Sequence, residues 1–253
     1  MPRKHLIASG INKKQQSQAK IWNKLAKEIK AAAKIGGPNP ESNHRLKAAI
    51  DKALQNNLSK ESIEKNIKGA SQDKNNQTDY LFEAYGPKGL AIIVQGLTDN
   101  QNRLISSLKG YLSKLKAELA TPNSVKINFR YCGEILVSVN GKNEKEIEEE
   151  KNNLDLLIVE TLVDKNLDLE IYDIIANEDC IQILVNPNHF YQLRDLLKNI
   201  DIKIIQSEIK YIPNDYVDLD KENFEKLERF LNSCEEDDDI QWVVTNFGEI
   251  LNE

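Results

Sequence analysis

Cysteine and histidine are scarce in this sequence, and neither residue type is clustered. The three histidines lie far apart in the chain, and so do the three cysteines, Cys132, Cys180 and Cys234. A zinc site or a disulfide scaffold needs such residues at short, regular spacings. We therefore expect three buried free thiols in a reducing compartment, and no metal site.

Long apolar runs and signature motifs are also missing. No apolar stretch approaches the ~20 residues that cross a bilayer, and no GxxxxGK[ST], GxGxxG, GxSxG or HExxH motif occurs. We expect a cytoplasmic protein with no membrane partner, no cofactor and no enzymatic activity. An enzyme with dispersed catalytic groups stays an alternative, because such sites are defined by geometry rather than by sequence position.

The sequence is rich in charge, which is unevenly distributed. Residues 1–68 contain 15 basic and 5 acidic residues, a formal net charge of +10, whereas residues 69–253 contain 19 and 35, a net charge of −16. Abundant lysine and asparagine indicate an AT-rich bacterial genome, but that bias would not place the lysine excess in one quarter of the chain. The asymmetry predicts a segment that binds a polyanion, nucleic acid before membrane.

The first predicted helix, about residues 13–34, has two contrasting faces. Its apolar stripe consists of Ile21, Trp22, Leu25, Ile29, Ala32 and Ala33. At ~100° per residue the opposite side carries Lys13, Lys20, Lys24, Lys27, Lys30 and Lys34. One interpretation is that these lysines only solvate the helix. Because like charges on one face repel each other, we favour binding to phosphates instead.

Two further short helices complete a basic all-helical domain, residues 1–75. The segment KIGGPNP ends the first helix. The second helix is predicted to start near Pro40, with Asn39 as its cap. The third is predicted to lie between the cap Ser59 and Gly69.

The remaining sequence predicts two α/β domains. The strand-like segments YLFEAY and LAIIVQGLT flank the turn GPKG, and a helix at about 103–119 and the strand SVKINFRY follow. Residues 134–212 show the order β-α-β-β-α-β, which is ferredoxin-like. One more helix and strand would complete a discontinuous domain, residues 78–133 plus 213–253. The predicted fold class is α+β: an N-terminal three-helix domain followed by two ferredoxin-like α/β domains, one inserted in the other.

Two acidic runs stand out in this part, EKEIEEEKNN at 144–153 and CEEDDDIQ at 234–241. Clustered carboxylates can bind Mg²⁺ or Ca²⁺, but neither run has the D-x-D-x-D-G spacing of a calcium loop. We expect solvated acidic surface. A basic protein partner for the acidic domains is a further alternative.

Several segments together resemble the YebC-type family: KIWNKLAKEIKAAAKIGG, NHRLKAAIDKALQNNLSKESIEKNI, YGPKGLAIIVQGLTDNQNR, NSVKINF and, near the C-terminus, YIPNDYVDLDKENFEKLERFLNSCEEDDDIQWVVTNF. Members are described as probable transcriptional regulators, and relatives act as translational activators on bacterial or mitochondrial ribosomes. The resemblance covers nearly the whole chain. It implies a helical N-terminal domain and two α/β domains, one inserted in the other.

The first twenty residues depart from that family. Members usually begin with a stretch like GHSKWANIKHRKAAQDAKR, whereas this chain has RKHLIASGINKKQQSQA. Basic character is kept without the usual pattern. The predicted nucleic-acid-binding residues are Arg3, Lys4, Lys13, Lys14, Lys20, Lys24, Lys27, Lys30 and Lys34.

Two functions would use these same residues. One is a non-enzymatic, DNA-binding transcriptional regulator of the YebC type, and the other is a ribosome-associated translation factor that contacts rRNA. No helix-turn-helix reader helix is recognisable, and arginine is scarce, with only Arg3 and Arg45 before residue 69. Lysine positions phosphates better than it distinguishes bases. The sequence therefore leaves DNA and rRNA open.

Overall fold

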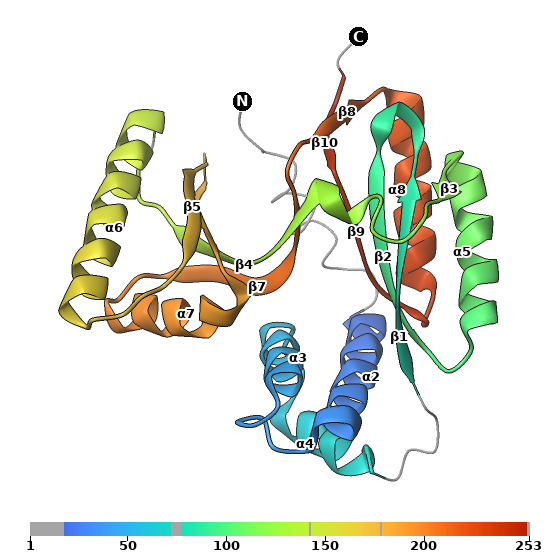
Figure 1. Cartoon of the computed structure of the whole chain (residues 1–253), viewed down its shortest axis with the longest axis horizontal. Helices are drawn as coiled ribbons and strands as arrows, with labels where there is room; N and C mark the ends of the chain where they lie inside the picture. Colours follow the sequence, from blue (N-terminus) through green and yellow to red (C-terminus); the bar gives the residue numbers. More distant parts are fainter. Residues whose placement is uncertain (1–17, 72–76, 142, 178, 252–253) are drawn as a thin grey trace. The chain divides into compact units, whose positions relative to one another are not determined.

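The computed structural model describes residues 18–71, 77–141, 143–177 and 179–251. Among these described residues it contains two compact units, one within residues 129–212 and the other within residues 18–128 together with 213–251. Helices lead the chain and antiparallel sheets follow (Figure 1). The predicted α+β class is confirmed, while the exact boundaries of three domains stay a prediction.

Three helices form the N-terminal part: α2 (Gln18–Gly36), α3 (His44–Gln55) and α4 (Lys60–Gly69). Their apolar faces meet in one core, which includes Leu25, Ile29, Ala32, Ala33, Leu46, Ala49, Ala53, Leu58 and Ile63. The predicted apolar stripe of the first helix therefore packs as expected. Residues 13–17 of that predicted helix lie outside the described residues.

The second helix begins later than predicted, and its cap is Asn43 rather than Asn39. The buried Asn43 side chain accepts a hydrogen bond from the backbone N–H of Leu46 at 3.0 Å. Its Nδ2 also donates to the carbonyl oxygens of Ala32 and Gly37, at 2.8 Å each. This one amide therefore closes the end of α2 as well as the start of α3, which the local sequence pattern does not reveal.

The third helix is capped as predicted. The Ser59 hydroxyl accepts a hydrogen bond from the backbone N–H of Ser62 at 3.2 Å. Leu58, just before the cap, is buried in the same core as Ile63. The pair forms the hydrophobic staple that fixes how the chain enters α4.

An antiparallel sheet follows the helical part. β1 (Thr78–Tyr85) and β2 (Ala91–Thr98) form a hairpin around the turn at Pro87–Gly89. The strand order is β3-β1-β2-β9, with β3 at Glu118–Leu119 and β9 at Ile240–Thr245. Helices α5 (Gln101–Leu115) and α8 (Lys221–Glu236) pack against this sheet in a shared core. A short parallel pair, β8 (Val217–Leu219) and β10 (Phe247–Ile250), completes the unit.

Two predicted elements are present in this region, but their bounds are wrong. The predicted helix at 103–119 ends at Leu115, because Lys116 adopts a left-handed φ of 59°, and β3 follows. The predicted strand SVKINFRY is a turn in its first part. The buried Glu83 carboxylate accepts hydrogen bonds from three backbone N–H groups within residues 123–126, at 2.5–2.7 Å. Those bonds favour a turn over a strand, and the true strand starts at Phe129.

The inserted unit has the predicted β-α-β-β-α-β order. Its elements are β4 (Phe129–Ser138), α6 (Glu144–Asp164), β5 (Ile171–Ala176), β6 (Cys180–Val185), α7 (Phe190–Asn199) and β7 (Ile204–Pro213). The strand order β5-β6-β4-β7 is ferredoxin-like. The first acidic run forms the beginning of α6, where carboxylates complement the positive end of the helix dipole.

All three cysteines are free and buried, as predicted. Burial raises the pKa of Cys132 to about 11 and the pKa of Cys234 to about 12. In the part of the chain that the structure describes, none of the helices is both long and apolar enough to cross a bilayer. Within the same residues, no three His, Cys, Asp or Glu side chains are grouped so that they could hold a metal ion.

We predict that Asn43→Ala lowers the free energy of unfolding by about 2 kcal/mol, because it removes a cap and leaves two carbonyl groups without their donor. Asn39→Ala is the matched control, since the exposed Asn39 side chain only accepts from the N–H of Glu41. It should cost less than about 0.5 kcal/mol. Urea unfolding of both variants measures the difference. Equal losses would contradict the assignment of Asn43 as the cap.

Candidate nucleic-acid interface

Lysines line the side of α2 that faces away from the helical core. Lys20, Lys24 and Lys27, which we call the lysine row, follow at spacings of four and three residues, about one helical turn each. Ala31 lies one turn beyond Lys27 on the same side. It is only 5% exposed, yet it is not part of the helical core. This side of α2 is therefore covered rather than open to solvent.

The acidic run at the end of α8 lies against the lysine row. We call residues 234–239 the acidic turn; it contains the last residues of α8 and the connection to β9. The last turn of α8 includes Glu235 and Glu236 and has no basic residue. Carboxylates at a helix C-terminus are unfavourable, because they lie at the negative end of the helix dipole. The acidic turn is therefore stabilised by cations from another element.

Two members of the lysine row contact the last turn of α8. Lys20 forms an ion pair with the carboxylate of Glu236. The amino group of Lys24 donates to the carbonyl oxygen of Cys234 at 3.1 Å. Burial lowers the pKa of Lys24, and the nearby carboxylates of the acidic turn offset that effect only in part. The amino group of Lys24 therefore gives up part of its hydration in this contact.

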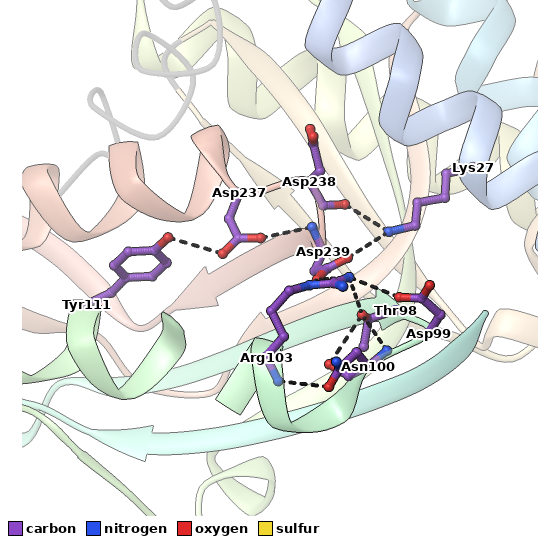
Figure 2. A network of polar contacts seen from close by, with 9 residues as sticks. All are labelled: Lys27, Thr98, Asp99, Asn100, Arg103, Tyr111, Asp237, Asp238 and Asp239. Carbon is purple, nitrogen blue, oxygen red and sulfur yellow. Dashed lines mark hydrogen bonds and ion pairs between the residues drawn. The ribbon is translucent and has the colours of Figure 1, made fainter. Parts of the chain in front are cut away.

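Lys27 binds the other end of the acidic turn (Figure 2). Its amino group donates to the carbonyl oxygen of Asp238 at 3.0 Å and to Oδ1 of Asp239 at 3.1 Å. Asp239 is 7% exposed. Its second carboxylate oxygen accepts hydrogen bonds from Arg103 Nε at 2.7 Å and pairs with the NH2 group at 2.6 Å. Burial alone would raise the pKa of Asp239, but Arg103 and Lys27 outweigh it and the pKa is lowered.

The acidic turn also has anchors that do not involve α2. The Tyr111 hydroxyl donates to Asp237 at 3.1 Å, and Asp237 also accepts from the backbone N–H of Asp239 at 2.9 Å. The carbonyl oxygen of Asp239 accepts from the N–H of Leu97 in β2 at 2.8 Å. Together with Arg103, these bonds fix the carboxylates in place (Figure 2). The acidic turn is held by α5 and the sheet.

A second ionic contact joins the helices to the sheet. Arg45 of α3 donates from Nε to Glu28 at 2.8 Å and binds both carboxylate oxygens of Asp79 in β1, at 2.5 and 2.8 Å. Burial would lower the pKa of Arg45, but these carboxylates outweigh it and raise the pKa. A bidentate arginine–carboxylate pair fixes geometry as well as charge.

The structure divides the predicted binding residues into separate groups. Arg3, Lys4, Lys13 and Lys14 lie outside the described residues. The lysine row lies against the acidic turn. Lys30 lies partly exposed at another edge of α2, and Lys34 is exposed in the last turn. The predicted single lysine face is therefore not a single open surface.

Comparison with known proteins identifies the family. A model of the TACO1/YebC N-terminal domain matches residues 2–73, and a model of the TACO1/YebC second and third domain matches residues 77–247. The chain belongs to the TACO1/YebC family. The family resemblance inferred from the sequence is confirmed.

Relatives match over nearly the whole TACO1/YebC chain. A probable transcriptional regulatory protein of Malacoplasma penetrans is 61% identical over 99% of this chain and 100% of its own. A protein of the same description from Ureaplasma parvum serovar 3 is 53% identical over 99% of this chain and 100% of its own. A solved structure, the conserved hypothetical protein Aq1575 from Aquifex aeolicus, is 30% identical with a TM-score of 0.73, covering 94% of this chain and 93% of the other. The relatives are thus a family of probable transcriptional regulatory proteins.

A second basic group in this TACO1/YebC chain lies between α2 and α4. Lys30, Lys65 and Lys68 line a shallow hollow together with Glu61, Glu64, Asn66 and Gly69. Lys68 is 3.7 Å from the Glu64 carboxylate, and both side chains are largely exposed. Such an exposed pair contributes little to stability.

The pairing of the lysine row with the acidic turn is the feature that the sequence analysis missed. Solvated surface was predicted for residues 234–241, and that prediction is wrong for Asp239, which is buried, and for Glu236, which pairs with Lys20. The opposite net charges of the two parts of the chain were a signal for it. Net charge does not say which residues meet, because the two runs are about 210 residues apart.

We predict that Asp239→Asn lowers the free energy of unfolding at pH 7 by about 2 kcal/mol, since a carboxylate with two cationic donors is lost. The folded-state pKa of Asp239 is below its unfolded value. Its contribution is therefore complete above the unfolded pKa of ~3.9 and is lost as the pH falls through the folded-state pKa. The difference between wild type and variant should close at acid pH.

Asp238→Asn is the matched control, because Asp238 binds Lys27 through its backbone carbonyl oxygen and its side chain is exposed. It should change stability by less than about 0.5 kcal/mol. Urea titrations between about pH 3 and pH 7 measure both variants. A loss for Asp239→Asn that is unchanged at pH 3 would contradict the ionic role.

Proposed function

We propose that this chain is a non-enzymatic, nucleic-acid-binding regulator of gene expression, and that its helical N-terminal part makes the contact. The observation that carries the proposal is the division of charge. The segment with net charge +10 supplies α2, α3 and α4, which share one core. The name shared by its relatives supports a regulatory role. We place this role in the cytoplasm, which agrees with three free thiols.

The hollow between α2 and α4 is the surface that we assign to phosphate contact first. Lys65 and Lys68 are exposed there, and Lys30 joins them from a different helix. Cations from two helices can follow a phosphate backbone, and each such contact releases condensed counterions from the nucleic acid. We extend the same role to the lysine row when the acidic turn does not cover it.

Contacts of this kind favour backbone over base recognition. Arg45 is the one arginine in α2, α3 and α4, and its guanidinium is bound to Glu28 and Asp79. It therefore has no free bidentate edge for guanine. Lysines alone position phosphates, so we propose that affinity rather than base-specific contact dominates the binding. The relatives' description supports a transcriptional regulator, and we propose DNA as the nucleic acid that it binds.

The alternative is a translation factor that contacts rRNA on the ribosome, and one observation favours it. α6 has three outward apolar side chains at helical spacing, Leu156, Val159 and Val163, which are 62%, 58% and 73% exposed. Carboxylates occupy the first turns of the same helix. An apolar stripe beside negative charge fits a basic protein, and ribosomal proteins are of that kind.

Crosslinking in cells, followed by sequencing of the bound nucleic acid, decides between the two targets. Enrichment of promoter DNA supports the transcriptional regulator. Enrichment of large-subunit rRNA supports the translation factor. Enrichment of neither nucleic acid over an uncrosslinked control would contradict both forms of the proposal.

We predict that changing Lys30, Lys65 and Lys68 together to Gln weakens binding of the full chain to labelled duplex DNA and RNA. Loss of three phosphate contacts should reduce the slope of log K against log salt by about 2 to 3. The matched control changes Lys145, Lys198 and Lys203, exposed lysines of the inserted unit, to Gln. Fluorescence anisotropy over a salt series measures both. Equal weakening by the control would contradict the assignment to the helical part.

A further inference from the structure

The acidic turn presents to α2 the same chemical groups that a nucleic acid would present. The lysine row meets the Glu236 carboxylate, the Asp239 carboxylate and the carbonyl oxygens of Cys234 and Asp238. These are anionic or partly negative oxygens, arranged so that successive turns of one helix each find an acceptor. A phosphate backbone also offers a row of anionic oxygens to such a helix. The acidic turn thus offers the three amino groups the same kind of acceptor as a phosphate backbone does.

The acidic turn does not need α2 to keep its shape. Arg103 and Tyr111 of α5 hold Asp239 and Asp237, and the N–H of Leu97 binds the backbone of Asp239. The helical part has its own core on the opposite side of α2, built around Ile29 and Leu46. Separation of the lysine row from the acidic turn thus breaks polar contacts, and full separation of the helices from the sheet also breaks the Arg45–Asp79 pair. Both cores stay intact.

The contacts themselves are of a kind that can be exchanged. Lys20 and Glu236 are 36% and 65% exposed, so water and salt reach their ion pair. Two of the other contacts are single hydrogen bonds from an ammonium group to a carbonyl oxygen. Polar, partly hydrated contacts between parts of one chain resemble transient interfaces rather than permanent ones. Only the Lys27–Asp239 pair is largely buried.

We propose that the acidic turn is an internal competitor for nucleic acid: it occupies the lysine row in the closed chain and is displaced when phosphates bind there. This inference rests on the proposed function and adds a regulation to it. In the closed chain the hollow with Lys30, Lys65 and Lys68 makes the first contact, because its lysines do not face the acidic turn. Displacement then adds Lys20, Lys24 and Lys27.

Competition has a consequence for salt dependence. When phosphates replace the acidic turn, counterions are released from the nucleic acid but return to the uncovered carboxylates. The closed chain therefore shows a shallower salt slope than its total number of lysines implies. Its apparent affinity for nucleic acid is also reduced, to the affinity of the open form multiplied by the fraction of molecules that are open.

The test neutralises three carboxylates of the acidic turn in the full chain, the partly exposed Glu235 and the exposed Glu236 and Asp238, with Glu235→Gln, Glu236→Gln and Asp238→Asn. Asp237 and Asp239 are left unchanged, because they hold the turn. The matched control is Glu148→Gln, Glu149→Gln and Glu160→Gln, exposed carboxylates of α6 that change the net charge equally. Binding to labelled duplex DNA and RNA is measured over a salt series. Urea unfolding confirms that both variants are folded.

We call the variant with the neutralised acidic turn the released variant. It should bind nucleic acid about tenfold more tightly than the α6 control variant at ~0.1 M salt, and its slope of log K against log salt should be steeper by about 2. A second set of variants completes a double-mutant cycle. In it, Lys20, Lys24 and Lys27 are changed to Gln both in the native chain and in the released variant. In the native background these changes should alter affinity less than about twofold, and in the released background they should abolish the gain.

Three outcomes overturn the inference in different ways. If the released variant and the α6 control gain the same affinity for nucleic acid, the gain comes from the change in net charge and the competition is absent. If the lysine changes weaken the native chain as much as the released one, the lysine row is already open to nucleic acid. If no variant binds either nucleic acid, the proposed function itself fails, and the inference fails with it.

Discussion

The contact of Lys27 with Asp239 is the interaction on which the placement of α2 against the acidic turn depends. Asp239 is buried between a lysine of α2 and Arg103 of α5, so one carboxylate joins the helical part, the sheet and α5. Burial alone would raise the pKa of Asp239, and the two cations outweigh burial and lower it. The position of this residue at the α8–β9 connection therefore decides which side of α2 is covered and which lysines stay accessible.

The same contact brings together the basic N-terminal segment and the acidic remainder of the chain. A basic segment and an acidic segment in one protein attract each other before either meets a partner. The structure places that attraction at the end of α8, where the helix dipole makes the carboxylates unfavourable without added cations. The two segments therefore contact each other within one chain, through Lys20, Lys24 and Lys27.

Family membership and geometry support different parts of this account. The TACO1/YebC match covers nearly the whole chain and establishes a regulator family. Geometry separates the basic residues into a row that contacts the acidic turn and an exposed hollow whose carboxylates, Glu61 and Glu64, come from α4 itself. The bound state of Arg45 adds that its guanidinium is used to join α3 to β1 rather than to contact bases. Lysine therefore remains the main cation for a partner.

Local pattern determined the elements of this protein, while contacts between distant residues decided how they meet. The sequence alone predicted the apolar stripe of α2, the Ser59 cap and the β-α-β-β-α-β order of the inserted unit, because these depend on neighbours in the chain. It misplaced the second cap and the strand after α5, because Asn43 and Glu83 bind backbone groups outside their own helix or strand. It also predicted one open lysine face. Only the tertiary structure showed that the lysine row meets the acidic turn, since their approach is set by packing rather than by periodicity.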